Sequence, residues 1–159
     1  MNIDTLDRQI IQATQAGLPL VAEPYRAIAE QLGLSEHDVM ARMSRMQQVG
    51  IIRRIAAVPN HYKLGYRHNG MTVWDVDDKH VDALGRRVAE LPFVSHCYQR
   101  PRHLPDWPYN LFAMVHGRSE DDAERQVAII ADLLGAYARG HEVLYSTKIL
   151  KKTGLRIAN

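Results

Sequence analysis

The hydrophobic positions at the start of the chain recur at helical spacing in three stretches. Apolar side chains repeat every three or four residues over 3–10, 25–32 and 39–46. Gly33 and Gly50 follow the second and third stretches, as is typical where helices end. The pattern therefore predicts three short helices, the last two joined by a glycine-containing turn as in a helix-turn-helix.

The hydrophobic period changes from helical to alternating after Gly50. Residues 51–58 are rich in β-branched and apolar side chains and predict the strand of a wing, closed by a Pro59-Asn60 turn. Further strands are expected over 71–76, 93–100, 109–116 and 142–150, with helices over 78–91 and 123–137. The order after the wing is then β-α-β-β-α-β, a ferredoxin-like arrangement whose helices cover only one face of the sheet.

The fold class expected from these elements is α+β, with two domains. Residues 1–58 would form a winged helix-turn-helix domain, and residues 59–159 a ferredoxin-like domain that binds a ligand or carries out catalysis. The chain has 159 residues, of which 46% are hydrophobic, which is enough for two small cores.

Composition limits the cellular compartments and partners expected for the protein. The only cysteine is Cys97, so no intrachain disulfide can form and a reducing compartment is expected. There is no signal-peptide pattern and no apolar run of membrane-spanning length, which together predict a cytoplasmic protein. A net charge of +2 does not by itself require a nucleic-acid partner.

Strand alternation places chemically useful groups together along residues 93–100. One face would carry Val94, His96, Tyr98 and Arg100, and the other Phe93, Ser95 and Cys97. The first face offers a proton donor, a hydrogen-bonding phenol and a fixed cation within one patch. A solvated strand face is the alternative interpretation.

The loop that follows this strand is rich in proline and aromatic residues. Its chemically distinctive members are Arg102, His103, Trp107 and Tyr109. Prolines reduce the entropy lost when a loop becomes ordered, and aromatic side chains in a stiff loop suit the flat face of a ligand. Alternatively, it is an ordinary hairpin loop whose Trp107 packs back onto the core.

A second basic group lies around the boundary between the predicted domains. Its members are Arg53, Arg54, His61, Lys63, Arg67 and His68. In winged-helix proteins such residues often contact phosphate, and arginine matches carboxylates equally well. Solvated charges on a wing are the alternative.

Other motifs are absent or point to structural roles. His116 shares a predicted strand face with Phe112 and Met114, which favours a packed structural histidine. No cluster of histidine, cysteine and aspartate has zinc spacing, and no glycine-rich phosphate loop is present. We therefore expect the protein to have no metal site of its own.

Two parts of the chain resemble the siroheme decarboxylase family. The similar stretches are residues 53–66 with 69–76, and residues 96–101 with 105–117. The most specific run is Asp-Trp-Pro-Tyr-Asn-Leu at 106–111, and the general layout resembles Lrp/AsnC-like proteins, including their RAM-like second domain, over essentially the whole chain. Gly70 departs from the family pattern, in which a small residue such as alanine is expected.

The resemblance implies a carboxy-lyase that removes carboxyl groups from two acetate side chains of siroheme. The product, didecarboxysiroheme, feeds alternative haem or haem d1 synthesis. The resemblance also implies a paralogous partner subunit, in a heterodimer or a fused chain, with neither DNA nor a membrane as partner. No cofactor is expected beyond the iron-tetrapyrrole substrate, although haem binding stays open.

The resemblance also suggests roles for individual residues. An arginine on the departing carboxylate would oppose loss of CO2, so most arginines are assigned to carboxylates that stay. The expected substrate-binding residues are Arg53, Arg54, His61, Arg67, Arg102, Trp107 and Tyr109. The expected catalytic residues are His96, Tyr98, Arg100 and His103, with His96 the first choice as proton donor and His103 the second. His61 and His103 are both candidates to ligate the substrate iron.

Two other functions stay open from the sequence. In a DNA-binding Lrp/AsnC-type regulator that senses a small ligand or haem, the recognition helix would span residues 35–49. Glu36 and Asp38 near its start disfavour binding in a DNA groove, whereas Arg42 and Arg45 favour it. The third reading is a haem-binding partner without activity that supports a catalytic sister subunit.

Overall fold

The computed structural model describes residues 3–148, 150–151 and 156–157 and divides into two compact units. One unit comprises Met1–Val58 with Lys151–Asn159, and the other Pro59–Leu150. The sequence-based second domain extended to residue 159, whereas the compact unit around the sheet ends at Leu150. In the first unit, the Gln15 side chain exchanges two hydrogen bonds with the backbone of Ile157, at 2.9 and 3.4 Å.

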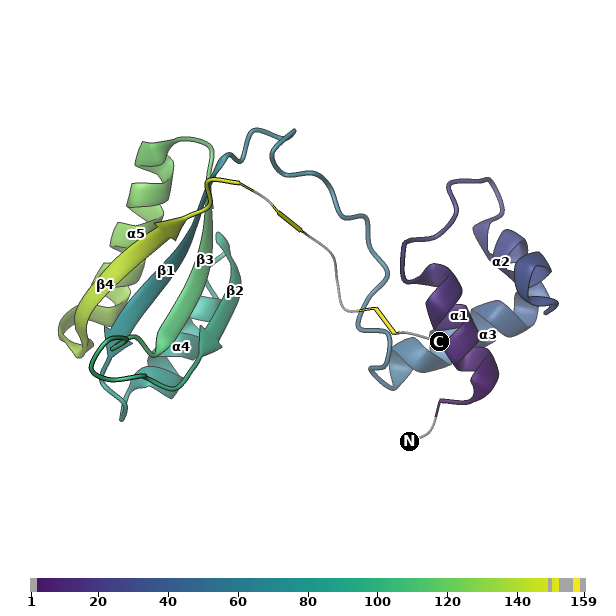
Figure 1. Cartoon of the computed structure of the whole chain (residues 1–159), viewed down its shortest axis with the longest axis horizontal. Helices are drawn as coiled ribbons and strands as arrows, with labels where there is room; N and C mark the ends of the chain where they lie inside the picture. The colour runs from purple at the N-terminus through teal and green to yellow at the C-terminus, as the bar shows by residue number, and fades with distance from the viewer. Residues whose placement is uncertain (1–2, 149, 152–155, 158–159) are drawn as a thin grey trace. The chain divides into compact units, whose positions relative to one another are not determined.

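The described residues of the first unit form three helices, as predicted (Figure 1). They are α1 (Thr5–Thr14), α2 (Pro24–Leu32) and α3 (Glu36–Gln48). Gly33 ends α2 in the left-handed conformation with φ of 68°, and the Ser35 side chain caps the start of α3. The core of the unit consists of Ile10, Ile28, Ala29, Val39, Met43 and Met46.

The prediction of a wing strand over residues 51–58 is wrong. Residues 51–58, all of them described, contain no helix or strand, and Ile55 and Val58 are 45% and 87% exposed. An apolar, β-branched segment becomes a strand only where a neighbouring strand supplies hydrogen bonds, and this segment pairs with no other described segment. Over its described residues, the first unit is therefore a helix-turn-helix without a wing strand.

The second unit is the predicted ferredoxin-like domain. Its elements are β1 (His68–Val76), α4 (Val81–Ala89), β2 (Val94–Gln99), β3 (Leu111–Gly117), α5 (Glu120–Leu134), the short 3-10 helix η1 (Gly135–Tyr137) and β4 (Ala138–Tyr145). The strands pair antiparallel in the order β2-β3-β1-β4, and α4 and α5 cover the same face (Figure 1). The core between helices and sheet includes Trp74, Leu84, Val88, Leu111, Val115, Ile130 and Leu134.

The last strand lies earlier in the chain than expected. β4 spans Ala138–Tyr145 rather than 142–150, because it pairs with β1 from Val76 back to Gly70. The edge of β1 therefore sets where β4 begins and ends, and one further backbone hydrogen bond, from the Ser146 amide to the Asn69 carbonyl at 3.5 Å, follows the strand. Residue 149 of the predicted strand lies outside the described residues.

A β-bulge in β2 changes which side chains face the helices. Val94 pairs with Val115 but His96 pairs with Met114, so Ser95 is an extra residue in β2. Val94 consequently packs on the helix-covered core, and Ser95 turns to the face that carries His96. The regular alternation predicted for residues 93–100 is wrong at these two positions.

Candidate functional site

The face of the sheet opposite α4 and α5, called the open face below, carries the chemically distinctive side chains. It consists of Ser95, His96 and Tyr98 from β2, Phe112, Met114 and His116 from β3, Asn69, Met71 and Val73 from β1, and Glu142 and Leu144 from β4. Met71 and Met114 lie opposite each other at its centre. The open face therefore has an apolar floor bordered by polar and aromatic groups.

His96, Tyr98 and Arg100 form a row along β2 and just beyond it. The rings of His96 and Tyr98 are stacked with centroids 6.2 Å apart. The Arg100 guanidinium lies 5.6 Å from the ring centre of Tyr98 and 5.1 Å from that of Phe112. All three side chains of the row are exposed, and the aromatic rings hold the arginine cation in place without neutralising it.

The proline-rich segment 100–110 forms a hairpin at one end of the open face. His103 and Trp107 exchange backbone hydrogen bonds of 2.9 and 2.8 Å near its tip. Trp107 stacks on Phe112 with centroids 6.4 Å apart, as in the alternative interpretation of this loop, and its ring stays partly exposed. Tyr109 contacts Trp107 edge-on and donates a hydrogen bond of 2.7 Å to Glu142.

Arg102 anchors the hairpin through contacts within the protein. Its side chain is 13% exposed and forms ion pairs with Asp75 and Asp78. Its guanidinium also donates to the backbone carbonyls of Val76 and Pro108. These acceptors use its hydrogen-bonding groups, so we no longer assign Arg102 to substrate carboxylates.

Asn110 is a second anchor of the hairpin, which the sequence analysis did not identify. Its side chain is buried, accepts a hydrogen bond from the Val76 amide at 2.9 Å, and donates to the Val76 carbonyl and to Asp78 at 2.8 Å each. The residue lies in the most family-specific run of the sequence. That run therefore includes both an anchor and the aromatic residues that the anchor positions.

A hydrogen-bonded chain of side chains begins at His96. Ser95 Oγ lies 3.0 Å from His96 Nδ1 and 2.6 Å from His116 Nε2, and His116 Nδ1 lies 2.6 Å from Asn69 Oδ1. Sequence reasoning missed this chain because it placed Ser95 on the wrong face and treated His116 as a packed structural residue. The pairing of two polar side chains across β2 and β3 depends on the bulge, which the alternation pattern does not reveal.

The remaining predicted site residues lie in different places. The His61 ring is 5.6 Å from that of His116, so His61 belongs to the polar end of the open face. His103 is exposed near the hairpin tip, and Arg67 is exposed just before β1. Arg53 and Arg54 belong to the first unit, whereas the open face belongs to the second.

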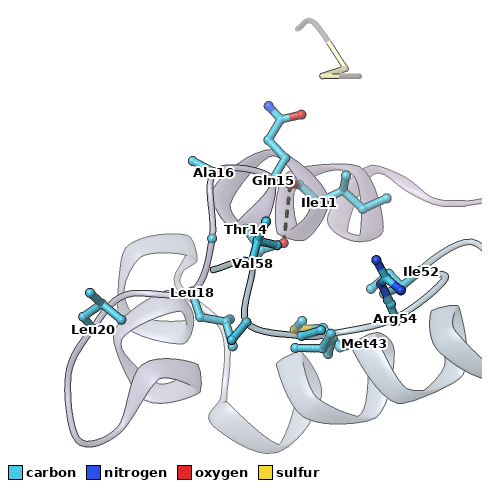
Figure 2. Close-up of a pocket in the computed structure, with 14 residues that line it drawn as sticks. Ile11, Thr14, Gln15, Ala16, Leu18, Leu20, Met43, Ile52, Arg54 and Val58 are labelled. Carbon is cyan, nitrogen blue, oxygen red and sulfur yellow. Dashed lines mark hydrogen bonds between the residues drawn. The ribbon is translucent and has the colours of Figure 1, made fainter. Parts of the chain in front are cut away.

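Arg54 instead lines a large pocket in the first unit (Figure 2). The pocket has a volume of about 790 Å³ and is formed by α1, the loop after it, Met43 and the extended segment 52–58. Apolar side chains such as Ile11, Leu18 and Ile52 dominate its wall, and Arg54 is the one charged residue among the described residues that line it. The pocket therefore suits an apolar occupant better than a polyanion.

Two side chains have pKa values that bear on the site. The hydrogen bond from Arg139, assisted by Arg102, outweighs burial and holds the pKa of Asp75 below its usual value, which keeps this anchor ionised. Burial raises the pKa of the Cys97 thiol, so Cys97 is not a reactive nucleophile.

The described residues contain neither a metal-binding cluster nor a membrane-spanning helix. No group of three or more histidine, cysteine, aspartate or glutamate side chains there has metal-binding geometry. The helices in the same part of the chain are too short or too polar to span a bilayer.

The arginines of α3 are paired within the first unit. Arg42 donates to Asp7 at 2.8 Å and to Asp4 at 2.7 Å, and Arg45 also forms an ion pair with Asp7. Asp7 is 1% exposed, so both cations are tied to a buried carboxylate of α1. They were the residues that favoured DNA binding, and this pairing removes much of that argument.

Comparison with known proteins identifies both units. Residues 7–53 match the family model of the siroheme decarboxylase NirDL-like HTH domain, and residues 63–151 match that of the AsnC-like ligand binding domain. The chain is 63% identical to the siroheme decarboxylase NirH subunit of Pseudomonas aeruginosa, over 96% of this chain and 90% of that protein. It is 39% identical to the siroheme decarboxylase beta subunit of Methanosarcina barkeri, over 98% of this chain and 100% of that protein.

Solved structures agree with these matches. The crystal structure of the siroheme decarboxylase NirDL in co-complex with an iron-uroporphyrin III analogue aligns with a TM-score of 0.67 and 31% identity, over 99% of this chain and 47% of that one. The structure of AsnC from E. coli aligns with a TM-score of 0.78 and 24% identity, over 98% and 99% of the two chains. At that identity the likeness to AsnC shows the fold alone.

Proposed function

The chain belongs to the siroheme decarboxylase family, and from this premise we propose that its open face binds siroheme and supports the loss of CO2 from two acetate side chains. The protein is then a carboxy-lyase subunit that yields didecarboxysiroheme. Relatives are named as subunits, which supports a paralogous partner chain. We propose a heterodimer, or a higher assembly of the two chains, as the active form.

One observation carries this proposal: the row of His96, Tyr98 and Arg100 borders an apolar floor beside an anchored aromatic hairpin. A tetrapyrrole is flat and apolar across its faces and carries carboxylates around its edge. The floor and Trp107 match the flat face, and Arg100 matches a carboxylate at the edge. The apolar pocket of the first unit lacks this combination.

The reaction needs one proton for each carboxyl group that leaves. The bond between the acetate methylene carbon and its carboxylate breaks, CO2 departs, and the electron pair passes into the conjugated macrocycle. A proton added to the methylene carbon then completes the methyl group, so no oxidant or reductant is consumed. The chain must therefore supply a binding surface, a dry place for the departing carboxylate and a proton donor.

His96 is the proposed donor, because it is exposed on the open face and borders the apolar floor. Tyr98 stacks on it and is proposed to orient the ring or to substitute as a weaker donor. Arg100 is proposed to hold a carboxylate that stays, since binding the departing one would stabilise the starting state. His103, near the hairpin tip, is the second candidate donor.

The other assignments from the sequence continue as proposals. Trp107 and Tyr109 are proposed to contact the macrocycle, and Arg67 to bind a peripheral carboxylate. Arg53 and Arg54 are proposed to contact substrate carboxylates only in the assembled protein. His61 and His103 are the two proposed ligands for the substrate iron, and the visible spectrum of bound siroheme in variants with alanine at each position distinguishes them.

The decisive experiment is anaerobic turnover of siroheme by the purified chain, alone and with its paralogous partner, followed by product mass and visible spectrum. Loss of two CO2 molecules in either arrangement supports the proposal, and a requirement for both chains indicates a shared site. No loss in either arrangement contradicts it.

His96→Gln tests the assigned donor. We expect turnover to fall by about 10²- to 10⁴-fold, the usual contribution of a positioned general acid, while siroheme binding is retained. His80→Gln is the matched control, because His80 hydrogen-bonds Asp77 at 3.1 Å and packs on Tyr137, outside the open face. Turnover in His96→Gln equal to that of the control would contradict the assignment of His96 as the proton donor.

A further inference from the structure

We propose that Ser95 and His116 are positioning residues that hold His96 in a single tautomer, with its hydrogen on Nδ1 and with Nε2 left to exchange a proton with the substrate. The inference rests on the proposed role of His96 as donor. It follows from the direction of each hydrogen bond in the chain that runs from Asn69 to His96.

The side chain of Asn69 sets the direction of the hydrogen bonds in this chain. Its side-chain Nδ2 donates to the Tyr66 carbonyl at 3.2 Å, so its Oδ1 is the atom that faces His116 Nδ1 at 2.6 Å. An amide oxygen only accepts, and His116 Nδ1 must therefore carry the hydrogen. Asn69 is 5% exposed, which limits the freedom of this amide to turn over.

The backbone of His116 is held as firmly as its ring. Its amide donates to Gln126 Oε1 at 3.1 Å, and Gln126 Nε2 donates back to the His116 carbonyl at 3.0 Å. With Nδ1 protonated, neutral His116 presents Nε2 as an acceptor. Nε2 lies 2.6 Å from Ser95 Oγ, so the serine hydroxyl donates its one hydrogen there.

Because the Ser95 hydroxyl hydrogen is donated to His116, the direction of the hydrogen bond between Ser95 and His96 is also fixed. Ser95 Oγ has no second hydrogen, so at 3.0 Å from His96 Nδ1 it acts as the acceptor. Nδ1 of His96 therefore carries a hydrogen, and Nε2 is the remaining nitrogen. The hydrogen bond made by one ring nitrogen sets the state of the other, which is how oriented histidines are commonly tuned.

The β-bulge makes the arrangement possible. In a regular strand, Ser95 and His96 would point to opposite faces. The extra residue places both on the open face, within reach of His116 on β3. Bulges that re-aim a side chain are common beside active sites.

The chain of bonds also suits a reaction that runs twice on each substrate. When His96 is protonated on both nitrogens, Nδ1 can keep donating to Ser95 while Nε2 gives its proton to the methylene carbon. The ring then returns to the same neutral tautomer in the same orientation. Only Nε2 must gain a proton before the second decarboxylation.

Other titratable groups lie close to this chain of bonds. The His61 ring is 5.6 Å from that of His116 and 4.4 Å from that of Tyr62, and the Tyr98 ring is 6.2 Å from that of His96. The tautomer is therefore read in the full-length protein, with these neighbouring rings in place.

The test is ¹⁵N NMR of histidine-labelled full-length protein, with the His96 signals assigned by their loss in His96→Gln. We expect wild-type His96 to show a protonated Nδ1 and an unprotonated Nε2. Ser95→Ala removes the acceptor, and His116→Leu frees the serine hydrogen to donate to His96 Nδ1, so both should shift His96 toward the opposite tautomer. Ser95→Thr restores the hydroxyl and should restore the Nδ1-protonated form, and His80→Gln should change nothing.

Kinetics with siroheme give the second readout. Ser95→Ala should lower kcat by about 10-fold or more while leaving KM within about twofold, because a lost outer partner typically costs 10- to 100-fold. An Nε2-protonated tautomer in wild-type His96, or an unchanged tautomer in Ser95→Ala, overturns the inference. The tautomer is measured without turnover, so an inactive protein with the expected NMR signals counts against the proposed function alone.

Discussion

The guanidinium of Arg102 forms an ion pair with the carboxylate of Asp75, which joins the aromatic hairpin to the end of strand β1. The two side chains are 13% and 18% exposed, so the pair is largely withdrawn from water. Arg139 also donates to Asp75, at 2.8 Å and with a side chain that is 55% exposed. The position of Trp107 over the open face therefore depends on a buried electrostatic contact that includes no proposed catalytic group.

Replacing Arg102 by methionine should loosen the hairpin and weaken the fold. Without Arg102, the buried carboxylate of Asp75 keeps only Arg139 as a charged partner. We therefore expect the free energy of unfolding to fall by about 2–3 kcal/mol. Siroheme binding should weaken with it, because Trp107 is no longer held over Phe112. Urea unfolding followed by tryptophan fluorescence reports this unit, since Trp74 and Trp107 both lie in it.

Arg139→Met is the matched control for that experiment. Arg139 contacts the same carboxylate from a more exposed position, and its loss should cost less than about 1 kcal/mol. Equal destabilisation by the two substitutions would show that Arg102 has no special part in anchoring the hairpin.

Arg100 should contribute to siroheme affinity through its planar guanidinium. Arg100→Lys keeps the charge but loses the stacking on Tyr98 and Phe112, and we expect the Kd to rise about 5- to 10-fold. Arg100→Met also removes the charge and should raise the Kd further, by about 30- to 100-fold. Spectroscopic titration with siroheme measures both, with Arg86→Met on the exposed face of α4 as the control. An unchanged Kd in Arg100→Met would remove this residue from the site.

The first unit should lose stability in acid through Asp7. Burial alone would raise the pKa of Asp7, but hydrogen bonds from Arg45 and Arg42 outweigh it and hold that pKa below the ordinary value of 3.8. A depressed folded-state pKa contributes stability that is fully present above 3.8 and is lost as the pH falls through the lower folded value. The stability difference between wild type and Asp7→Asn should therefore be constant near neutral pH and shrink below 3.8.

Amide hydrogen exchange in α1 and α3 measures this difference without contribution from the second unit. Glu30→Gln in α2 of the same unit is the control, because its partner Arg26 is 58% exposed and the pair should add little stability. A stability difference that grows as the pH falls would contradict the sign given for Asp7.

The helix-turn-helix should bind DNA only weakly. Arg42 and Arg45 are tied to Asp7, and the start of α3 presents Glu36 and Asp38, so few cations are available for phosphates or base edges. Fluorescence anisotropy with promoter duplexes at several salt concentrations should show weak binding that does not depend on sequence. Tight binding to one duplex with a steep salt dependence would instead favour the regulator.

The main elements of the fold follow from the hydrophobic period, because that period distinguishes helices from strands and identifies the face that each one buries. Two errors have a common cause, which is that strand pairing is not a local property. Residues 51–58 have strand composition but pair with no described strand, and β4 begins at Ala138 because β1 determines the ladder. Intrinsic preference indicates that a segment can pair but not with what it pairs.

The arrangement of the candidate site residues was predictable where it depends on side-chain type and not where it depends on strand register. His96, Tyr98 and Arg100 lie together as alternation suggests, since they come after the bulge. Ser95 was placed on the wrong face because one extra residue reverses its direction. The role of Arg102 was missed because its partner Asp75 is 27 residues away, and sequence alone does not show whether an arginine meets a carboxylate of the protein or of a ligand.

Gly70 should be necessary for close contact between β1 and β4 in this chain. A Cβ at this position would lie 2.7 Å from Val143 Cγ1 and 3.3 Å from Tyr145 Cε1, and the first distance is shorter than side-chain carbons tolerate. We expect Gly70→Ala to lower the free energy of unfolding by about 1–3 kcal/mol, the usual cost of overpacking. Urea unfolding measures the loss.

Two variants make this prediction specific to the clash. Val143→Ala removes the methyl group that the new Cβ would meet, so adding it to Gly70→Ala should recover part of the loss in a double-mutant cycle. Gly140→Ala is the control in the same pair of strands, because a Cβ there would meet no atom within 4 Å and should change stability by less than about 0.5 kcal/mol. An alanine at position 70, as expected from the family pattern, would then require a smaller neighbour on β4. A Gly70→Ala protein as stable as wild type would contradict the prediction, because β4 would then move aside without cost.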